Sequence, residues 1–215
     1  MSLFYRTPKQ SVGRANQDYW LDLRRFNPKW YRRARCASQL LTREWVCDIG
    51  CGRQDLSRYL DPQAVYLPAD LAAWESGVAI CDLNKREYPE DYLAAADCAV
   101  FLGVFERIDD VPTVLSDLAD RVEHLCMSYH DANRLKNWPH QWGMALGREE
   151  LVRMVENAGF TVGKTLYFNN TQIILRANSN RFQAFEEREH ARSRVALKPL
   201  SAKVRIARAI NAVLR

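Results

Sequence analysis

Two closely spaced glycines follow an acidic residue at the end of the first hydrophobic run of this 215-residue chain. The run reads Val46-Cys47-Asp48-Ile49-Gly50-Cys51-Gly52. Glycine tolerates positive φ and has no Cβ, so the backbone can turn sharply and a ligand can approach it closely. We therefore predict a strand-to-helix turn at the entrance of a cofactor pocket. The alternative is a tight turn without a ligand, because Gly-x-Gly alone is a weak signal.

The residues after the turn indicate which cofactor fits. A dinucleotide-binding turn carries a third glycine that lets a pyrophosphate lie against a helix N-terminus. Here that position is Asp55, whose carboxylate would repel a pyrophosphate. S-adenosylmethionine carries ammonium and sulfonium cations, which acidic side chains near the turn, such as Asp48, would attract. The sequence therefore favours S-adenosylmethionine over NAD or FAD.

Two further acids end the next predicted strands. Residues 64–70 read as a second strand that ends at Asp70, about twenty residues past the glycines, the usual place of an acid that accepts hydrogen bonds from ribose hydroxyls. Residues 78–81 form a short third strand, and Asp82 follows it at the expected adenine edge. The alternative role of Asp82 is the N-cap of a helix that begins at Leu83.

Two downstream segments complete the pattern. Residues 97–110 contain a hydrophobic run that leads into Val104-Phe105-Glu106-Arg107-Ile108, and residues 147–160 contain a helical pattern that ends at Gly159. Together with the glycine turn and Asp70, these segments resemble the ordered motifs of class I S-adenosylmethionine-dependent methyltransferases. The resemblance covers about residues 44–177. It implies methyl transfer with S-adenosylmethionine as cofactor and S-adenosylhomocysteine as product.

The resemblance also implies a set of cofactor-binding positions and no metal site. The cofactor-binding positions are Asp48, Gly50, Cys51, Gly52, Asp70, Leu71, Asp82, Leu83, Leu102 and Gly103. The chain departs from the family pattern at Gln54, where a glycine is usual, and at Arg107, where a histidine follows the glutamate. These departures motivate an alternative function, a non-catalytic protein that keeps the methyltransferase fold and binds RNA, membrane or a protein partner through its basic termini.

The expected reaction transfers a methyl group to an O or N atom of a small molecule, lipid or glycan intermediate. A general base is needed only if the nucleophile must lose a proton. The candidates are His130 and Asp131, just past the fifth strand, and His140 between Trp138 and Trp142. Each has a structural alternative, a cap for the first two and packing between tryptophans for the third. The Asn/Asp-Pro-Pro-Tyr/Phe turn of base-methylating enzymes is absent, which disfavours nucleic-acid substrates.

The predicted fold class is α/β, a doubly wound Rossmann-like sheet of seven strands whose last strand is reversed. The predicted domains are an N-terminal helical cap at 1–44, the cofactor-binding domain at 45–178 and a basic helical extension at 179–215. Predicted strands cover 45–49, 65–70, 78–81, 98–102, 124–129, 160–168 and 172–176. Predicted helices lie within 15–43 and near 54–60, 85–95, 110–120 and 147–158.

Charge is divided between the centre and the ends of the chain. The net charge is +7 over residues 1–45, −8 over 46–178 and +6 over 179–215. Ordinary solvated helix surface explains such blocks, and so does an anionic partner. Apolar residues at helical spacing from Leu200 to Leu214 predict a basic helix that packs on the domain, joins a homodimer or contacts a membrane peripherally. We expect packing, because the segment lacks bulky aromatic anchors.

The six cysteines form no Cys-x-x-Cys pair and fall mainly on predicted core strands. Free cysteines behave as small buried hydrophobic residues, so reduced structural thiols are expected. No run of eighteen apolar residues exists, and the first eight residues lack the apolar core of a signal peptide. These features predict a cytoplasmic protein.

Overall fold

The computed structural model describes residues 26–73, 75, 77–139, 142–183, 185–195, 205–206 and 208–210. The strands are β1 (Trp45–Ile49), β2 (Val65–Asp70), β3 (Ala79–Ile80), β4 (Cys98–Leu102), β5 (His124–His130), β6 (Phe160–Phe168) and β7 (Gln172–Ser179). The α-helices are α2 (Tyr31–Ala37), α3 (Glu90–Ala95), α4 (Val111–Ala119), α5 (Arg148–Asn157) and α6 (Phe185–Arg194). The 3-10 helices are η2 (Pro28–Trp30), η3 (Ser38–Leu40), η4 (Asp55–Arg58), η5 (Leu83–Lys85), η6 (Phe105–Arg107) and η7 (Ala132–Arg134).

The strands form one mixed sheet in the order β3-β2-β1-β4-β5-β7-β6. Strands β1 to β5 are parallel to one another, whereas β7 runs antiparallel to both β5 and β6. The predicted seven-stranded sheet with a reversed last strand is therefore confirmed. Asn169, Asn170 and Thr171 connect β6 to β7. The Thr171 N–H donates to the Phe168 carbonyl, and the central residues of this turn, Asn169 and Asn170, have φ values of 51° and 58°, which match the twist of the flanking strands.

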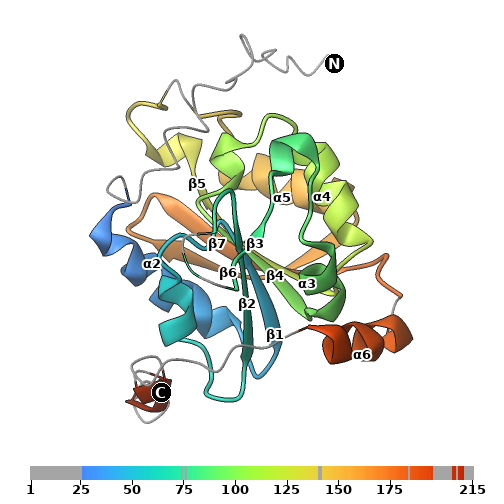
Figure 1. The fold of residues 1–215 in the computed structure, drawn as a ribbon. Coiled ribbons are helices and arrows are strands. Elements are labelled where there is room, and N and C mark those ends of the chain that lie inside the picture. The colour runs from blue at the N-terminus through green and yellow to red at the C-terminus, as the bar shows by residue number, and fades with distance from the viewer. Residues whose placement is uncertain are drawn as a thin grey trace.

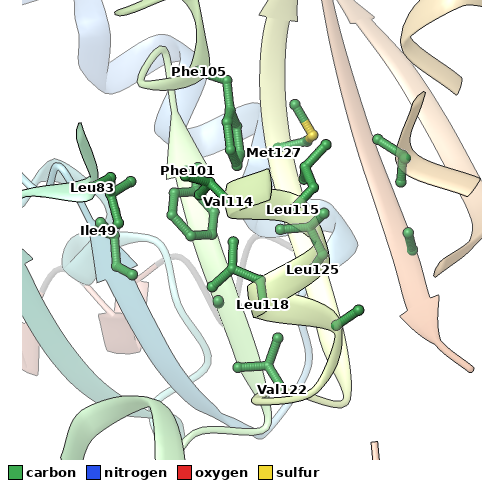
Figure 2. Close-up of a cluster of buried hydrophobic side chains, with 14 of the residues drawn as sticks. Ile49, Leu83, Phe101, Phe105, Val114, Leu115, Leu118, Val122, Leu125 and Met127 are labelled. Carbon is green, nitrogen blue, oxygen red and sulfur yellow. The ribbon is translucent and has the colours of Figure 1, made fainter. Parts of the chain in front are cut away.

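The sheet is covered on both faces, as Figure 1 shows, with α2 on one side and α3, α4 and α5 on the other. Alternate residues of each buried strand face opposite layers. On β1, for example, Val46 packs in the cluster below α2, whereas Cys47 and Ile49 pack in the larger cluster opposite. Figure 2 shows that larger cluster, in which Leu115 and Leu118 of α4 pack with Phe101 of β4 and with Leu125 of β5. This packing fixes where each strand ends and therefore where the site residues lie.

Several predicted elements differ in length or type. The predicted helix near 54–60 is the short 3-10 helix η4, and the one near 85–95 is divided into η5 and α3. Arg86 has φ 60° and Pro89 precedes α3, so the backbone between them cannot continue one helix. The third strand has two residues because it pairs only with β2 at the sheet edge. Strands β5 and β7 are longer than predicted.

The described part of the predicted C-terminal extension packs on the sheet domain. In α6, Ala191 is buried in the main cluster, and Arg188 and Arg192 both donate to Asp97 Oδ1 at 2.6 Å. Residues 205–206 and 208–210 are helical. Within the described ranges, no helix combines the length and apolar character needed to cross a bilayer. Residues 1–25, which belong to the predicted N-terminal cap, lie outside the described residues.

Candidate active site

A cavity of about 440 Å³ opens at the carboxyl ends of the parallel strands. Proteins with this kind of sheet bind ligands at that edge, and the volume is in the range of small-molecule sites. The lining residues of the described chain come from five segments and three single positions. The segments are 26–34, 48–56, 70–71, 81–85 and 102–109, each of which contributes some of its residues, and the single positions are His130, Trp142 and Gln172.

The glycine turn forms one side of this cavity. Gly50 and Gly52 have φ values of 75° and 49°, a conformation that favours glycine. The backbone N–H groups of Gly50 and Cys51 both donate to the carbonyl of Ala69, at 2.8 and 3.1 Å, so the turn is fixed to the end of β2. A Cβ on Gly52 would overlap the ring of Phe26. Only a glycine lets the segment before η2 approach the turn this closely.

Asp70 lies at the end of β2, directly beside the glycine turn. Its Oδ2 accepts a hydrogen bond from the Gly52 N–H and its Oδ1 accepts one from the Leu71 N–H, both at 2.7 Å. Burial raises the pKa of this carboxyl, and the two backbone donors oppose the shift. A carboxylate has about four acceptor sites. Asp70 therefore holds the turn and retains acceptor capacity on the cavity side.

Asp48 and Arg33 give the same region of the cavity two charged groups. Asp48 Oδ2 accepts a hydrogen bond from the Tyr66 hydroxyl at 2.7 Å, and burial raises the pKa of Asp48 to about 7. Arg33, on α2, donates from Nη2 to the Leu102 carbonyl at 2.7 Å and lies over the Trp30 ring. Burial lowers the pKa of Arg33 to about 10, and its Nε has no hydrogen-bond partner in the part of the chain that the structure describes. Sequence reasoning missed Arg33, because no motif connects α2 to the strand ends.

The other predicted cofactor positions also line the cavity. Asp82 does so while its Oδ1 accepts from the Asn84 N–H at 3.1 Å, which makes it the N-cap of η5 as well. Both roles that the sequence left open for Asp82 are therefore compatible with its position. The remaining predicted positions in the lining are Cys51, Leu71, Leu83, Leu102 and Gly103.

The three candidate bases have different surroundings. His130 lines the cavity, where its ring lies 4.4 Å from the Trp142 ring between centroids. Asp131 is not part of the cavity lining: its Oδ1 caps η7 through the Asn133 N–H, and its Oδ2 accepts from the Tyr167 hydroxyl. Its carboxylate is therefore engaged in the structural alternative predicted for it. His140 lies outside the described residues.

Glu106 is a site residue that no sequence motif connects with His130. Its carboxylate is fully buried, and Oε1 accepts from both the backbone N–H and Nδ1 of His130, at 3.0 and 2.7 Å. Burial alone would raise the pKa of Glu106, but the hydrogen bond and charge of His130 and the charge of Arg107 bring it below its ordinary value. Gln172, on β7, places its amide nitrogen 2.6 Å from Nε2 of His130.

The two departures from the family pattern have distinct positions. Gln54 adopts φ 57° and is not part of the cavity lining, so its side chain adds no bulk there. Arg107 does line the cavity, donates to the Gly103 carbonyl at 2.5 Å and lies over the Trp142 ring. Of the two departures that motivate the non-catalytic alternative, Arg107 therefore lies in the cavity and Gln54 does not.

The model of a methyltransferase domain matches residues 19–165 of this sequence. The chain belongs to the methyltransferase-domain family. S-adenosylmethionine is its methyl donor and S-adenosylhomocysteine is the product. A search of curated proteins finds no match to this sequence.

Solved structures have the same fold at low sequence identity. A SAM-dependent methyltransferase from Aquifex aeolicus is 16% identical with a TM-score of 0.54, over 79% of this chain and 98% of that one. An S-adenosylmethionine-dependent methyltransferase from Mesorhizobium loti is 12% identical with a TM-score of 0.51, over 73% and 100%. The pyocyanin biosynthetic protein PhzM is 14% identical with a TM-score of 0.52, over 73% of this chain and 60% of its own length.

The cavity residues fit this cofactor. The ribose hydroxyls need an acceptor, the methionine ammonium needs an anion and the carboxylate needs a cation. Asp70, Asp48 and Arg33 supply these groups within one cavity. Gly50 and Gly52 also line the cavity and add no side chain to the space among Asp70, Asp48 and Arg33.

Proposed function

We propose that this methyltransferase acts on an O or N atom of a small molecule, lipid or glycan intermediate that enters the cavity beside His130. In this proposal Asp70 accepts hydrogen bonds from the ribose, Asp48 faces the ammonium group and Arg33 binds the carboxylate of the methyl donor. Asp82, Leu83, Leu71, Leu102, Gly103 and Cys51 complete the cofactor contacts.

The observation that carries the proposal is the continuity of the cavity. The same 440 Å³ space contacts Asp70 at the end of β2, His130 at the end of β5, Gln172 at the start of β7, and Trp142. A cofactor bound at Asp70 therefore shares its cavity with these three side chains. Alignment of the acceptor and exclusion of water are the main contributions that a protein makes to such a transfer. A cavity of this size suits a small acceptor better than a folded nucleic acid.

A crystal structure with S-adenosylhomocysteine bound tests this arrangement. We expect the sulfur to face the compartment formed by His130, Trp142 and Gln172, with the ribose at Asp70. A sulfur directed toward an open, basic surface would contradict a small-molecule acceptor and favour RNA. We also propose a cytoplasmic location, supported by the six cysteines, all of which are free thiols.

A further inference from the structure

Glu106 and His130 form a pair that the cofactor site does not require. Glu106 lies in η6, after β4, and His130 is the last residue of β5, so the pairing of these two strands places both side chains at the same edge. His130 lines the cavity and Glu106 lies below it, shielded completely from solvent. The carboxylate therefore meets the cavity only through the imidazole ring.

The hydrogen bonds of Glu106 determine which ring nitrogen carries the proton. The pKa of Glu106 lies below its ordinary value, so its side chain is a carboxylate at neutral pH and Oε1 accepts from the backbone N–H of His130. The same Oε1 lies 2.7 Å from Nδ1, and a carboxylate oxygen can only accept, so Nδ1 carries a proton. In the neutral ring the lone pair is then on Nε2, the nitrogen away from the buried carboxylate, and His130 is the member of the pair that lines the cavity.

The ring is also held from its sides. Trp142 packs against it at 4.4 Å between centroids. The Gln172 amide nitrogen lies 2.6 Å from Nε2 and 3.1 Å from Nδ1, so it approaches beside the ring rather than in line with either nitrogen. An amide N–H at this distance is compatible with an unprotonated Nε2. His130 is therefore restrained at one nitrogen and along the ring, and the other nitrogen stays directed at the cavity.

Burying a charged carboxylate at this position costs more desolvation free energy than burying an uncharged amide would. Among the described residues Oε2 of Glu106 is buried without a hydrogen-bond partner, and removing such an oxygen from water is unfavourable. The charged groups around it are Arg107 on η6 and Arg33 on α2. A negative charge here becomes most favourable when His130 gains a proton, because the imidazolium lies in direct contact with it.

We infer that Glu106 is a positioning residue that fixes the Nδ1–H tautomer of His130, so that Nε2 takes the proton from a hydroxyl group of the methyl acceptor. This inference rests on the proposed function and names the acceptor class. The acceptor oxygen forms a bond to the methyl carbon while the carbon–sulfur bond breaks and its electron pair stays on sulfur. The hydroxyl proton moves to Nε2, and Glu106 stabilises the imidazolium that results.

Nitrogen NMR of histidine-labelled protein tests the inference without an acceptor. The chain has four histidines, and a His130→Asn variant identifies the signals of His130. In the wild-type protein at neutral pH we expect Nδ1 to be protonated and Nε2 to be unprotonated. In Glu106→Leu this preference should be lost, whereas Glu106→Gln, which keeps an oxygen acceptor, should retain it.

Glu123→Gln is the matched control. Glu123 lies beside His124 at the other end of β5, 3.5 Å from its Nε2, so this substitution should leave the His130 signals unchanged. A wild-type His130 that carries its proton on Nε2 overturns the inference even if Glu106→Leu does not fold. So does an identical tautomer in wild type and folded Glu106→Leu. Loss of S-adenosylhomocysteine binding by the wild type would instead contradict the proposed function and leave the tautomer result intact.

Discussion

Asp48 is buried at the end of β1, where it accepts a hydrogen bond from Tyr66 and contributes to the cavity lining. Burial raises its pKa from an ordinary value of 3.8 to about 7. Between these two values the unfolded chain releases the proton and the folded protein keeps it. Stability therefore falls as pH rises through this interval and is lowest, with respect to this group, above pH 7.

An Asp48→Asn variant should remove this pH dependence, because the amide cannot ionise but its oxygen still accepts from Tyr66. We expect the gain in unfolding free energy over wild type to be about 1 to 3 kcal/mol larger at pH 8 than at pH 5. Urea unfolding of the apo protein at both pH values measures it, with the exposed Asp91→Asn as control. The same gain at both pH values would mean that Asp48 ionises normally in the fold.

Some site residues could be predicted from the sequence because their chemistry is local. Asp48, Gly50 and Gly52 lie in one turn, and Asp70 lies at the end of the next predicted strand. Glu106 and His130 are 24 positions apart, and only the pairing of β4 with β5 brings them together. Asp131 has the residue type and position of a base, yet its hydrogen bonds are those of a cap.

At the scale of elements, the turn between β1 and η4 combines glycines with one strained residue. Gln54 adopts φ 57°, a left-handed conformation that costs a residue with a Cβ about 1 kcal/mol or more. This explains in physical terms why a glycine is usual at this position. The strain at Gln54 does not affect the shape of the cavity through the side chain, because Gln54 is not part of the cavity lining.

Gln54→Gly should therefore stabilise the protein by up to about 1 kcal/mol, because the relief of left-handed strain exceeds the cost of the freedom that glycine adds to the unfolded chain, and it should leave cofactor affinity unchanged. Gln63→Gly, at a nearby exposed turn residue without positive φ, is the control and should be neutral or destabilising, because glycine adds freedom to the unfolded chain. Thermal unfolding and S-adenosylhomocysteine titration measure the two effects. Weaker binding in Gln54→Gly would show that Gln54 contacts the cofactor.

Element type was harder to predict than element position. Four of the predicted strands, 45–49, 65–70, 98–102 and 160–168, have the observed bounds, and the other three differ by at most three residues at an end. The hydrophobic runs mark β1, β2 and β4 well because these strands are largely buried. The sequence pattern predicts single helices near 54–60 and 85–95, where the structure has η4 and the separate elements η5 and α3. The left-handed conformations of Gln54 and Arg86, and Pro89 before α3, interrupt regular helix at these points. Hydrophobic periodicity carries no information about such backbone conformations.

At the scale of the whole molecule, a buried arginine joins the C-terminal segment to the domain. Arg208 is almost fully buried, and its guanidinium donates to the carbonyls of Ser57 at 2.6 Å and Ala64 at 2.7 Å. These carbonyls belong to η4 and to the residue before β2. Ile210, which belongs to the predicted apolar face, is exposed, although the sequence pattern predicts that this face packs against a partner surface. A cation in the contact face cannot be predicted from an apolar pattern.

Arg208→Ala should lower the free energy of unfolding by about 1 to 3 kcal/mol, because it leaves buried carbonyls without donors. Arg205→Ala removes an exposed charge from the same helix, so it should change stability by about 0.5 kcal/mol at most. Equal and small effects of both substitutions would contradict packing of the tail on the domain. Binding of either variant to anionic vesicles at low salt then shows whether the segment serves a membrane instead.

Calorimetric titration of the wild-type protein with S-adenosylhomocysteine tests the central claim, that the cavity at the glycine turn and Asp70 is the cofactor site. We predict binding of one molecule per chain, weakened by about 1 to 3 kcal/mol in folded Asp70→Ala and unaffected in Asp91→Asn. Well-folded wild-type protein that binds neither S-adenosylhomocysteine nor S-adenosylmethionine, or that binds them equally well without the Asp70 carboxylate, would contradict it.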